Sequence, residues 1–417
     1  MSKITKIKGR QVFDSRGNPT VETEVHLDDG SKASAIVPSG ASTGTYEAFE
    51  LRDLGNKKYL GKSVFQAIEK VNGEISKALT GLPGEDQKKI DNTLIELDGT
   101  KQKKRLGANA ILSVSIALSK ASAISKKLPL YMNLGDGKTL PLPLMNVING
   151  GVHANNSLRI QEFMIRADKA KNFEEAINMC FLIIQKLKFI MNKKNLSTSV
   201  GDEGGFAPSL SNNEEAIEFI LESIEKSGFE AGKDISVCLD VASNELFKDK
   251  KYAVSSSKFV SSEKTIKYYL DLIKKYPIKS IEDPFSENDW SAWVSLTKLL
   301  NNNIQIVGDD LFVTNKERLL QGIKLKAANV ILIKPNQIGT LTETIDVINL
   351  AHQNNYKTII SHRSGDSEDT FIADLAVATN SSQIKTGSLS RSERVAKYNR
   401  LLRIEDELGN SAKMAKV

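Results

Sequence analysis

The strongest constraint on the fold is a repeat in which short β-branched runs end in a polar or charged residue and precede an amphipathic helical pattern. Six such runs occur beyond residue 230, and the residues that end successive runs lie between 24 and 42 positions apart. This spacing is close to the length of one strand–loop–helix–loop unit. The predicted strands are Ser236–Asp240, Lys279–Glu282, Gln305–Asp309, Val330–Lys334, Thr358–Ser361 and Gln383–Lys385.

Apolar residues at helical spacing predict a helix after each of these strands. The predicted helices are Thr265–Lys275, Trp290–Leu300, Asn315–Lys324, Leu341–His352, Thr370–Ala378 and Arg391–Leu408. Six consecutive βα units are compatible with a (β/α) barrel or an open doubly wound sheet. We favour the TIM barrel, because a residue capable of chemistry ends every strand, whereas an open sheet gathers its ligands at one switch point. These residues should therefore meet at one open end of the barrel, its mouth.

The chain before the repeat has a different pattern, which predicts a smaller α+β domain. Val21–Leu27 and Ala33–Val37 alternate around a turn, as in a β-hairpin. Ser63–Leu79 and Ala108–Ser125 have the apolar spacing of helices. The proline-rich stretch 140–143 interrupts the pattern. We predict an N-terminal α+β domain over residues 1–135 and a C-terminal TIM-barrel domain over residues 136–417.

The composition is that of a globular chain, with 40% hydrophobic residues and 57 basic against 51 acidic side chains. The densest basic run, Lys101–Arg105, has no interleaved aromatic residue, so a solvated loop is favoured over a nucleic-acid site. Cys180 and Cys238 are the only cysteines, which favours neither a disulfide framework nor a thiolate metal site. Residues 1–30 lack the apolar core of a signal peptide, and lysines interrupt the most apolar segment, so we predict a cytoplasmic protein without a membrane span.

Three carboxylates end different predicted strands: Asp240, Glu282 and Asp309. Clustered at one mouth, they would repel one another unless a cation neutralised them. Oxygen ligands without cysteine or histidine favour Mg²⁺, Mn²⁺ or Ca²⁺ over zinc. The alternative is that some of these acids cap the helices that follow.

Two lysines, Lys334 and Lys385, end strands of the same pattern. A lysine beside a second cation and bound metal has its ammonium form destabilised, so we expect its pKa to fall toward the range of a general base. A single lysine in such a position is compatible with a snorkelling surface residue. Two lysines opposite three acids favour catalysis or anion binding.

Several loops add weaker candidates. Glu203 lies among the glycines of Gly201–Pro208, where a loop can approach a ligand closely, and is a candidate general acid. Arg363 and Ser364 have the donors to hold a phosphate. Ser39–Gly44 is either a hinged lid or a turn. His153, His362 and the pair Gln161-Glu162 carry little weight alone, since the pair is equally compatible with the start of a strand.

Taken together, these motifs resemble the enolase family over essentially the whole chain. The blocks that carry the resemblance, in the order of the family, are Asp14–Glu22, Ser39–Gly44, Gly201–Pro208, Ser280–Phe285, Gly308–Leu311, Lys334–Gly339, Ser361–Gly365 and Ile384–Gly387. The resemblance implies a barrel with atypical first strands. It also implies reversible, Mg²⁺-dependent dehydration of 2-phosphoglycerate to phosphoenolpyruvate, with two Mg²⁺ ions per active site. At residues 53–56 and at the pair Asp366-Ser367 the sequence differs from the residues usual in the family.

The resemblance also implies roles for individual residues. Lys334 would abstract the proton next to the substrate carboxylate, and Glu203, supported by Glu162, would assist departure of the β-hydroxyl. The first Mg²⁺ would be held by Asp240, Glu282 and Asp309. A second would be placed with the help of Ser42 when the loop closes.

The same resemblance assigns the remaining contacts to substrate. Lys385 would face the substrate carboxylate, and Arg363 and Ser364 would face the phosphate. The pocket would be lined by His153, Gln161 and His362. A homodimer is the minimum expected, and an octamer is compatible with the family; Arg16 and Glu22 match positions that pair with the region of Arg403 and Asp406.

Three competing interpretations remain. Gly55–Ser63 resembles a phosphate-binding loop but has five residues between its glycines where four are required. Another member of the same superfamily, such as a racemase, would share the metal and base but not the Ser361–Gly365 block. Some enolases occur in secreted or cell-surface fractions and bind host plasminogen through lysines; this chain ends in Lys416-Val417, so binding through a terminal lysine is not expected.

Overall fold

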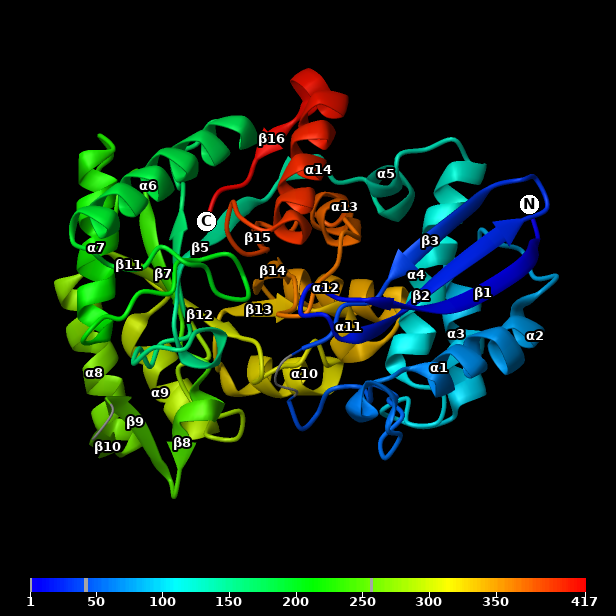
Figure 1. Ribbon diagram of the computed structural model, residues 1–417, viewed down its shortest axis with the longest axis horizontal. Coiled ribbons are helices and arrows are strands. Elements are labelled where there is room, and N and C mark those ends of the chain that lie inside the picture. Colours follow the sequence, from blue (N-terminus) through cyan, green and yellow to red (C-terminus); the bar gives the residue numbers. More distant parts are fainter. Residues whose placement is uncertain (1, 41–43, 256–257) are drawn as a thin grey trace.

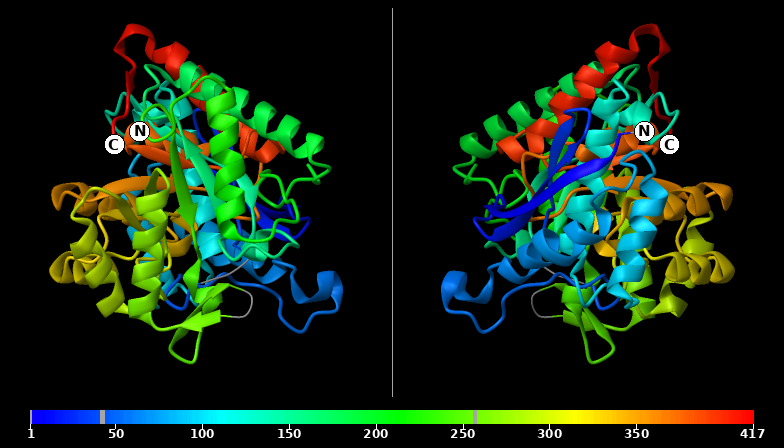
Figure 2. Two further views of the ribbon diagram at one scale, coloured as in Figure 1. Left: turned by 90° about the vertical axis from the view of Figure 1, so that its left-hand side faces the viewer. Right: turned by 90° about the vertical axis from the view of Figure 1, so that its right-hand side faces the viewer.

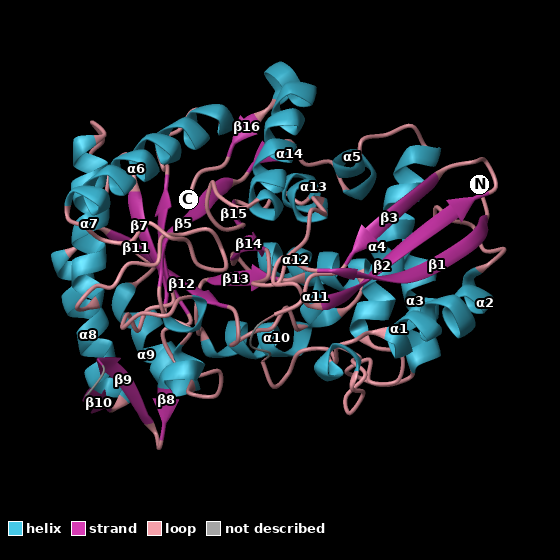
Figure 3. Ribbon diagram, viewed as in Figure 1, coloured by secondary structure: helices cyan, strands magenta, loops and turns pink. Residues whose placement is uncertain are grey.

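A computed structural model describes residues 2–40, 44–255 and 258–417 (Figure 1). The N-terminal sheet and its helices lie at one end of the molecule, and a barrel of strands surrounded by helices forms the rest (Figure 3). This two-part α/β architecture confirms the predicted fold class.

The N-terminal part is built on an antiparallel sheet of β1 (Ile4–Phe13), β2 (Pro19–Leu27) and β3 (Lys32–Ile36). The predicted hairpin is confirmed as β2 and β3, but β1 was not predicted. Its buried positions are Ile4, Ile7 and Gly9, and their uneven spacing among exposed lysines gives the strand no sustained alternation of apolar and polar residues. The α-helices of this part are α1 (Phe65–Lys70), α2 (Ser76–Leu79), α3 (Gln87–Asp98), α4 (Ala108–Ser125) and α5 (Leu130–Leu134). A π-helical turn, Val71–Ile75, joins α1 to α2.

Helix α4 packs against β2 and β3 (Figure 2). It is long and apolar enough to cross a membrane by composition, but 83% of it is buried inside the protein, as in the core helix of a globular domain. The segment Gly55–Ser63 follows no strand and contains a short 3-10 turn, so it lacks the strand–loop–helix context of a phosphate-binding loop.

Eight strands close the barrel in the order in which they occur along the chain. They are β5 (Leu142–Asn149), β6 (Glu162–Arg166), β7 (Ser236–Asp240), β11 (Ile278–Glu282), β12 (Gln305–Gly308), β13 (Val330–Ile333), β14 (Lys357–Ser361) and β15 (Gln383–Lys385). Strand β6 runs antiparallel to both of its neighbours, and the other pairs are parallel. The first strands are therefore atypical, as the family resemblance implies.

The outer layer consists of helices that follow the strands (Figure 1). They are α6 (Phe173–Lys193), α7 (Asn213–Lys226), α8 (Ser262–Lys275), α9 (Trp290–Leu300), α10 (Lys316–Leu325), α11 (Pro335–Ile338), α12 (Leu341–Gln353), α13 (Phe371–Ala378) and α14 (Ser392–Leu408). A small sheet of β8 (Phe247–Lys248), β9 (Lys251–Ser255) and β10 (Lys258–Val260) is inserted between β7 and α8. This insertion explains why the first interval of the sequence repeat is the longest. Short strands β4 (Thr139–Leu140) and β16 (Lys413–Met414) pair beside the barrel.

A layer of apolar side chains fills the barrel and separates its two ends. It consists of Leu144, Met164, Cys238, Val307, Val330, Leu332 and Ile359. At the floor, Arg166 ends the antiparallel strand β6 and donates hydrogen bonds to Gln305 (2.5 Å) and Gln383 (2.8 Å). At the mouth, the parallel strands end in the polar residues singled out in the sequence, as is usual for a barrel of this type.

Candidate active site

Strand ends bring the predicted carboxylates together at the mouth. Glu282 on β11 lies in register with Asp240 on β7, and both are buried. Glu162 begins its strand rather than ending it, but β6 is antiparallel, so its first residue pairs with Asp240 at the same level. Glu162 therefore begins a strand and also places its carboxylate at the mouth.

Lys385 lies at the centre of this cluster. Its ammonium nitrogen is 2.8 Å from Asp240 Oδ2, 2.8 Å from Glu282 Oε1 and 3.1 Å from Glu162 Oε1. Burial alone would lower the pKa of Lys385, but the surrounding carboxylates outweigh this and hold the pKa well above its usual value. Lys385 is therefore a fixed positive charge against the acids of β6, β7 and β11.

Lys334, directly after β13, forms a short ion pair with Asp309, directly after β12. Burial lowers the pKa of Lys334, but the Asp309 carboxylate outweighs it, so the pKa lies above its ordinary value. The expected fall of the Lys334 pKa applies to a site with bound metal, so it stays a prediction. The Asp309 carboxylate acts against this fall, because it contacts the ammonium directly.

The acids of the mouth carry a strong electrostatic penalty. Burial raises the pKa of Glu282 well above its ordinary value, and Asp240 adds to this. Burial and the charge of Glu203 likewise raise the pKa of Glu162. Burial and Asp309 raise the pKa of Asp310 to about 7. Such a cluster favours protonation or an added cation.

The donor set fits a hard divalent cation. Asp240, Glu282 and Asp309 offer buried carboxylate oxygens, the ligands that Mg²⁺ prefers. One oxygen of Glu162 is buried and has no hydrogen-bond partner among the described residues. Potential ligand oxygens of Asp283, Asp309 and Asp310 lie within 4.8 Å of one another, so Asp309 belongs to a second acidic group that the sequence analysis missed. Asp283 and Asp310 directly follow two predicted ligands, and that adjacency is the signal that would have found them.

Glu203 lies beside Glu162 and close to two histidines. Its Oε1 is 3.3 Å from Nε2 of His362 and 3.7 Å from Nδ1 of His153, and its Oε2 accepts a hydrogen bond from Asn146 (3.3 Å). Burial alone would raise the pKa of Glu203, but the imidazole of His362 that faces the carboxylate and the charge of Arg394 favour the ionised form and hold the pKa well below its usual value. Glu203 on its own is therefore ionised, which differs from the resting state expected of a general acid.

The backbone of the glycine-rich loop 201–208 holds Glu203 in this position. Gly204 has a φ of +84°, and a Cβ there would lie 2.6 Å from the backbone oxygen of Ser390. A side chain at this position would clash with the backbone of the barrel. The loop therefore needs glycine to bring Glu203 into the pocket.

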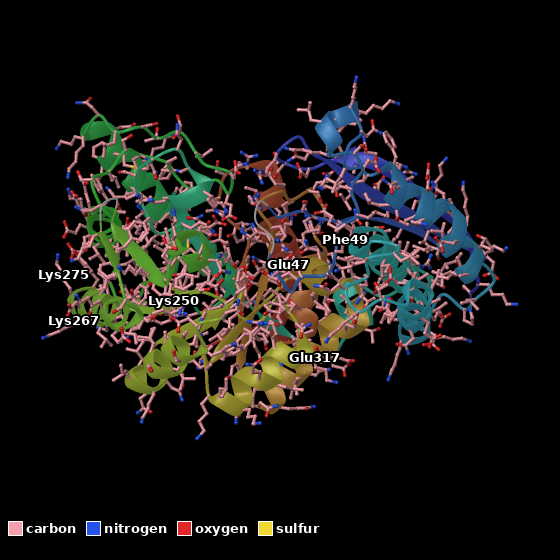
Figure 4. All side chains as sticks on the ribbon, turned by 90° about the horizontal axis from the view of Figure 1, so that it is seen from below. Glu47, Phe49, Lys250, Lys267, Lys275 and Glu317 are labelled. Atoms are coloured by element: carbon pink, nitrogen blue, oxygen red, sulfur yellow. The ribbon has the colours of Figure 1, made fainter. Side chains whose placement is uncertain are left out.

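Arg363 and Ser364 follow β14 and are buried at the mouth. The guanidinium of Arg363 donates to Glu47 Oε2 (3.0 Å) and to Asn336 Oδ1 (3.1 Å). Glu47, labelled in Figure 4, comes from the N-terminal part and also accepts from Gln337 (3.3 Å). Glu47 and Gln337 were not predicted, because contacts across some 300 residues leave no local pattern in a sequence.

A single pocket contains nearly all the predicted residues. Its lining includes Glu47, His153, Gln161, Glu162, Glu203, Asp240, Asp309, Lys334, His362, Arg363, Ser364 and Lys385. Glu282 lies beneath this lining, where both of its carboxylate oxygens accept hydrogen bonds from Lys385. Ser42 lies outside the described residues.

The mouth of the barrel combines buried carboxylates with two lysines and an arginine. This combination is typical of enzymes that remove a proton next to a carboxylate with the help of a divalent cation. Residues 4–134 match the family model of the enolase N-terminal domain, and residues 137–417 match that of the enolase C-terminal TIM barrel domain. The chain is 65% identical over 419 residues to the enolase of Pelagibacter ubique (strain HTCC1062), covering 100% of both chains. The chain belongs to the enolase family.

Family membership confirms the reaction that the resemblance implied. The enzyme is a phosphopyruvate hydratase, a lyase that reversibly removes water from 2-phospho-D-glycerate in glycolysis and gluconeogenesis. It binds its small-molecule substrate and uses a divalent metal.

Proposed function

We propose that Lys334 is the base that takes the proton next to the substrate carboxylate, with Lys385 facing that carboxylate. The observation that carries this proposal is the convergence of both ammonium groups on the buried acids of one mouth. An amine serves as a base only after losing its proton, so the Asp309 contact that raises the Lys334 pKa must weaken before catalysis. A ligand that engages Asp309 provides this change.

The metal is proposed to be Mg²⁺, two ions per active site. Asp240, Glu282 and Asp309 would hold the first, and Ser42 would help to place the second. Bound Mg²⁺ supplies positive charge that stabilises the charge developing on the substrate carboxylate. The buried oxygen donors without cysteine support this choice over zinc.

Loss of the β-hydroxyl is assigned to Glu203 with Glu162. Glu203 is ionised on its own, whereas the pKa of Glu162 is raised well above its usual range by burial and by Glu203. Ligand atoms of His153, Glu162 and Glu203 lie within 4.8 Å of one another, so a proton on Glu162 is close to Glu203. We assign the proton that leaves with the hydroxyl to this carboxyl pair.

The remaining pocket residues are proposed to bind and orient substrate. Arg363 and Ser364 would hold the phosphate, since a guanidinium and a hydroxyl donate to phosphate oxygens. His153, Gln161 and His362 would line the pocket around the three-carbon backbone. Glu47 and Asn336 hold the Arg363 guanidinium in place, which supports its assignment to the phosphate.

The test is a spectrophotometric assay of phosphoenolpyruvate formation with and without chelator. We expect chelator to abolish activity and Mg²⁺ to restore it. Lys334→Ala should lose at least a thousandfold in kcat while its far-UV circular dichroism is unchanged. Lys324→Ala, which changes an exposed lysine on α10, is the matched control and should retain full activity. Parent-like turnover by Lys334→Ala would show that the base is elsewhere.

The domain boundary, assembly and location complete the proposal. We place the boundary after residue 135, supported by family matches that meet between residues 134 and 137.

The enzyme is proposed to be a cytoplasmic homodimer or a larger ring such as an octamer. Within one chain Arg16 lies 3.3 Å from Asp202 and Glu22 pairs with Arg10. Arg403 and Asp406 are exposed on α14, where a partner subunit would reach them. Secretion and plasminogen binding stay predictions that surface labelling of intact cells would test.

A further inference from the structure

Arg394 on α14 is fully buried and lies directly behind the active site. Its guanidinium donates to the backbone oxygens of Arg363 (2.6 Å), Ser364 (2.7 Å) and Asp202 (3.2 Å). It also lies 2.6 Å from Nδ1 of His362. One side chain thus contacts the turn assigned to the phosphate and the histidine that faces Glu203.

The contact with His362 determines where the imidazole carries its proton. A guanidinium has donors and no acceptor, so Nδ1 of His362 must accept. In a neutral ring the proton then lies on Nε2. Nε2 is 3.3 Å from Glu203 Oε1, facing the carboxylate without the alignment of a full hydrogen bond. Such contacts often tighten only when substrate binds.

The surroundings of His362 keep the ring neutral. Burial lowers the pKa of His362 to about 4, against the opposing effect of Glu203. The charged groups that face the ring are Glu203 on one side and Arg394 on the other, with Asp366 behind them, 3.7 Å from Arg394. Asp366 in turn accepts from Lys397 (2.9 Å). Glu393 supplies a second carboxylate, 3.4 Å from Nε of Arg394. The carboxylates of Asp366 and Glu393 thus balance the two buried cations, Arg394 and Lys397, so burial of the guanidinium leaves no isolated charge.

We propose that Arg394 is a positioning residue that locks His362 in the Nε2–H tautomer, so that the ring presents a donor to Glu203. The same guanidinium holds the Arg363–Ser364 turn, which couples the phosphate contacts to the group that assists loss of hydroxide. The functional part of this inference rests on the proposed roles of Glu203 and Arg363. A purely structural arginine would tie the backbone turns together without requiring a particular tautomer.

The experiment uses ¹⁵N-histidine-labelled full-length enzyme and records imidazole ¹H–¹⁵N correlations at pH 7.5. The chain has 4 histidines, so the spectrum is simple, and the signal of His362 is assigned by its loss in His362→Asn. We expect the Nε2–H pattern for His362 in the parent. In Arg394→Met, which removes every donor but keeps a long side chain, we expect a mixture of tautomers and at least a tenfold lower kcat.

Arg400→Met is the matched control, because it removes a second arginine of α14 that pairs with Asp374 away from the pocket. It should leave the His362 pattern unchanged and kcat within twofold of the parent. An Nδ1–H or doubly protonated His362 in the parent overturns the proposal, and this result needs no variant. A folded Arg394→Met with an unaltered Nε2–H signal also overturns it. The proposed role of Glu203 is tested separately, by the kcat of Glu203→Gln, so the two failures are distinguishable.

Discussion

Lys385→Met tests the idea that one ammonium neutralises the acidic cluster. Lys385 contacts Asp240, Glu282 and Glu162, all buried, so its removal leaves three carboxylates without that partner. Removing one member of a buried ion pair typically costs about 3–5 kcal/mol. We expect a loss of that size in the free energy of unfolding in EDTA at pH 7.5.

The same reasoning fixes the pH dependence of the loss. Glu162 and Glu282 already have raised pKa values through burial, and removal of the ammonium raises them further. The folded variant then keeps protons that the unfolded chain releases above a pH of about 4.3. Its stability therefore falls as pH rises from there, so the difference from the parent is smallest near pH 4–5 and larger at pH 7.5.

The assay is urea unfolding followed by the fluorescence of the two tryptophans. Lys324→Met is the control and should change the free energy of unfolding by less than about 0.5 kcal/mol. Mg²⁺ at 100 times its Kd stabilises a protein by about 2.7 kcal/mol, and the gain should recover much of the loss in Lys385→Met. A Lys385→Met variant as stable as the parent in EDTA at pH 7.5 would refute the electrostatic reasoning.

Three further predictions follow from the same contacts. Asp309→Asn should weaken Mg²⁺ binding at least tenfold by calorimetry, because a neutral amide replaces an anionic ligand; unchanged affinity would remove Asp309 from the metal site. Glu47→Gln should raise the KM for 2-phosphoglycerate several-fold with a smaller change in kcat, because Arg363 loses its charged partner; an unaltered KM would contradict this. His362 has a pKa of about 4 against an ordinary value near 6.5, so it contributes stability above pH 6.5 that is lost as pH falls toward 4. The loss is about 3 kcal/mol, and His362→Asn should show a flatter pH profile over that range; a parallel profile would assign the acid sensitivity elsewhere.

The sequence predicted the barrel because its signal is local and repeated. Each βα unit carries its own apolar pattern, and the predictions for β7, β15 and α9 agree with the structure at both ends. The chemistry-bearing residues at strand ends lie at one mouth because parallel strands in a barrel share a direction. Their catalytic roles stay predictions.

What the sequence did not reveal depends on contacts between distant segments. The antiparallel direction of β6 brings Glu162 to the mouth, but the direction of a five-residue strand is not encoded in its own residues. The ion pair with Asp309 raises the pKa of Lys334, and this pair depends on the spacing of neighbouring strands. Arg394 lies in a helix with the ordinary appearance of a surface helix, and only the folded chain places it behind His362.

The most direct test of the account follows exchange of the proton next to the carboxylate of 2-phosphoglycerate in deuterated water, by proton NMR, with Mg²⁺ present. Proton removal and hydroxide loss are separate steps here, assigned to Lys334 and Glu203. We predict that the parent and Glu203→Gln exchange this proton, that Glu203→Gln forms little phosphoenolpyruvate, and that Lys334→Ala does neither. Exchange at the parent rate in Lys334→Ala would contradict the central claim, that an amine at the end of β13 is the base.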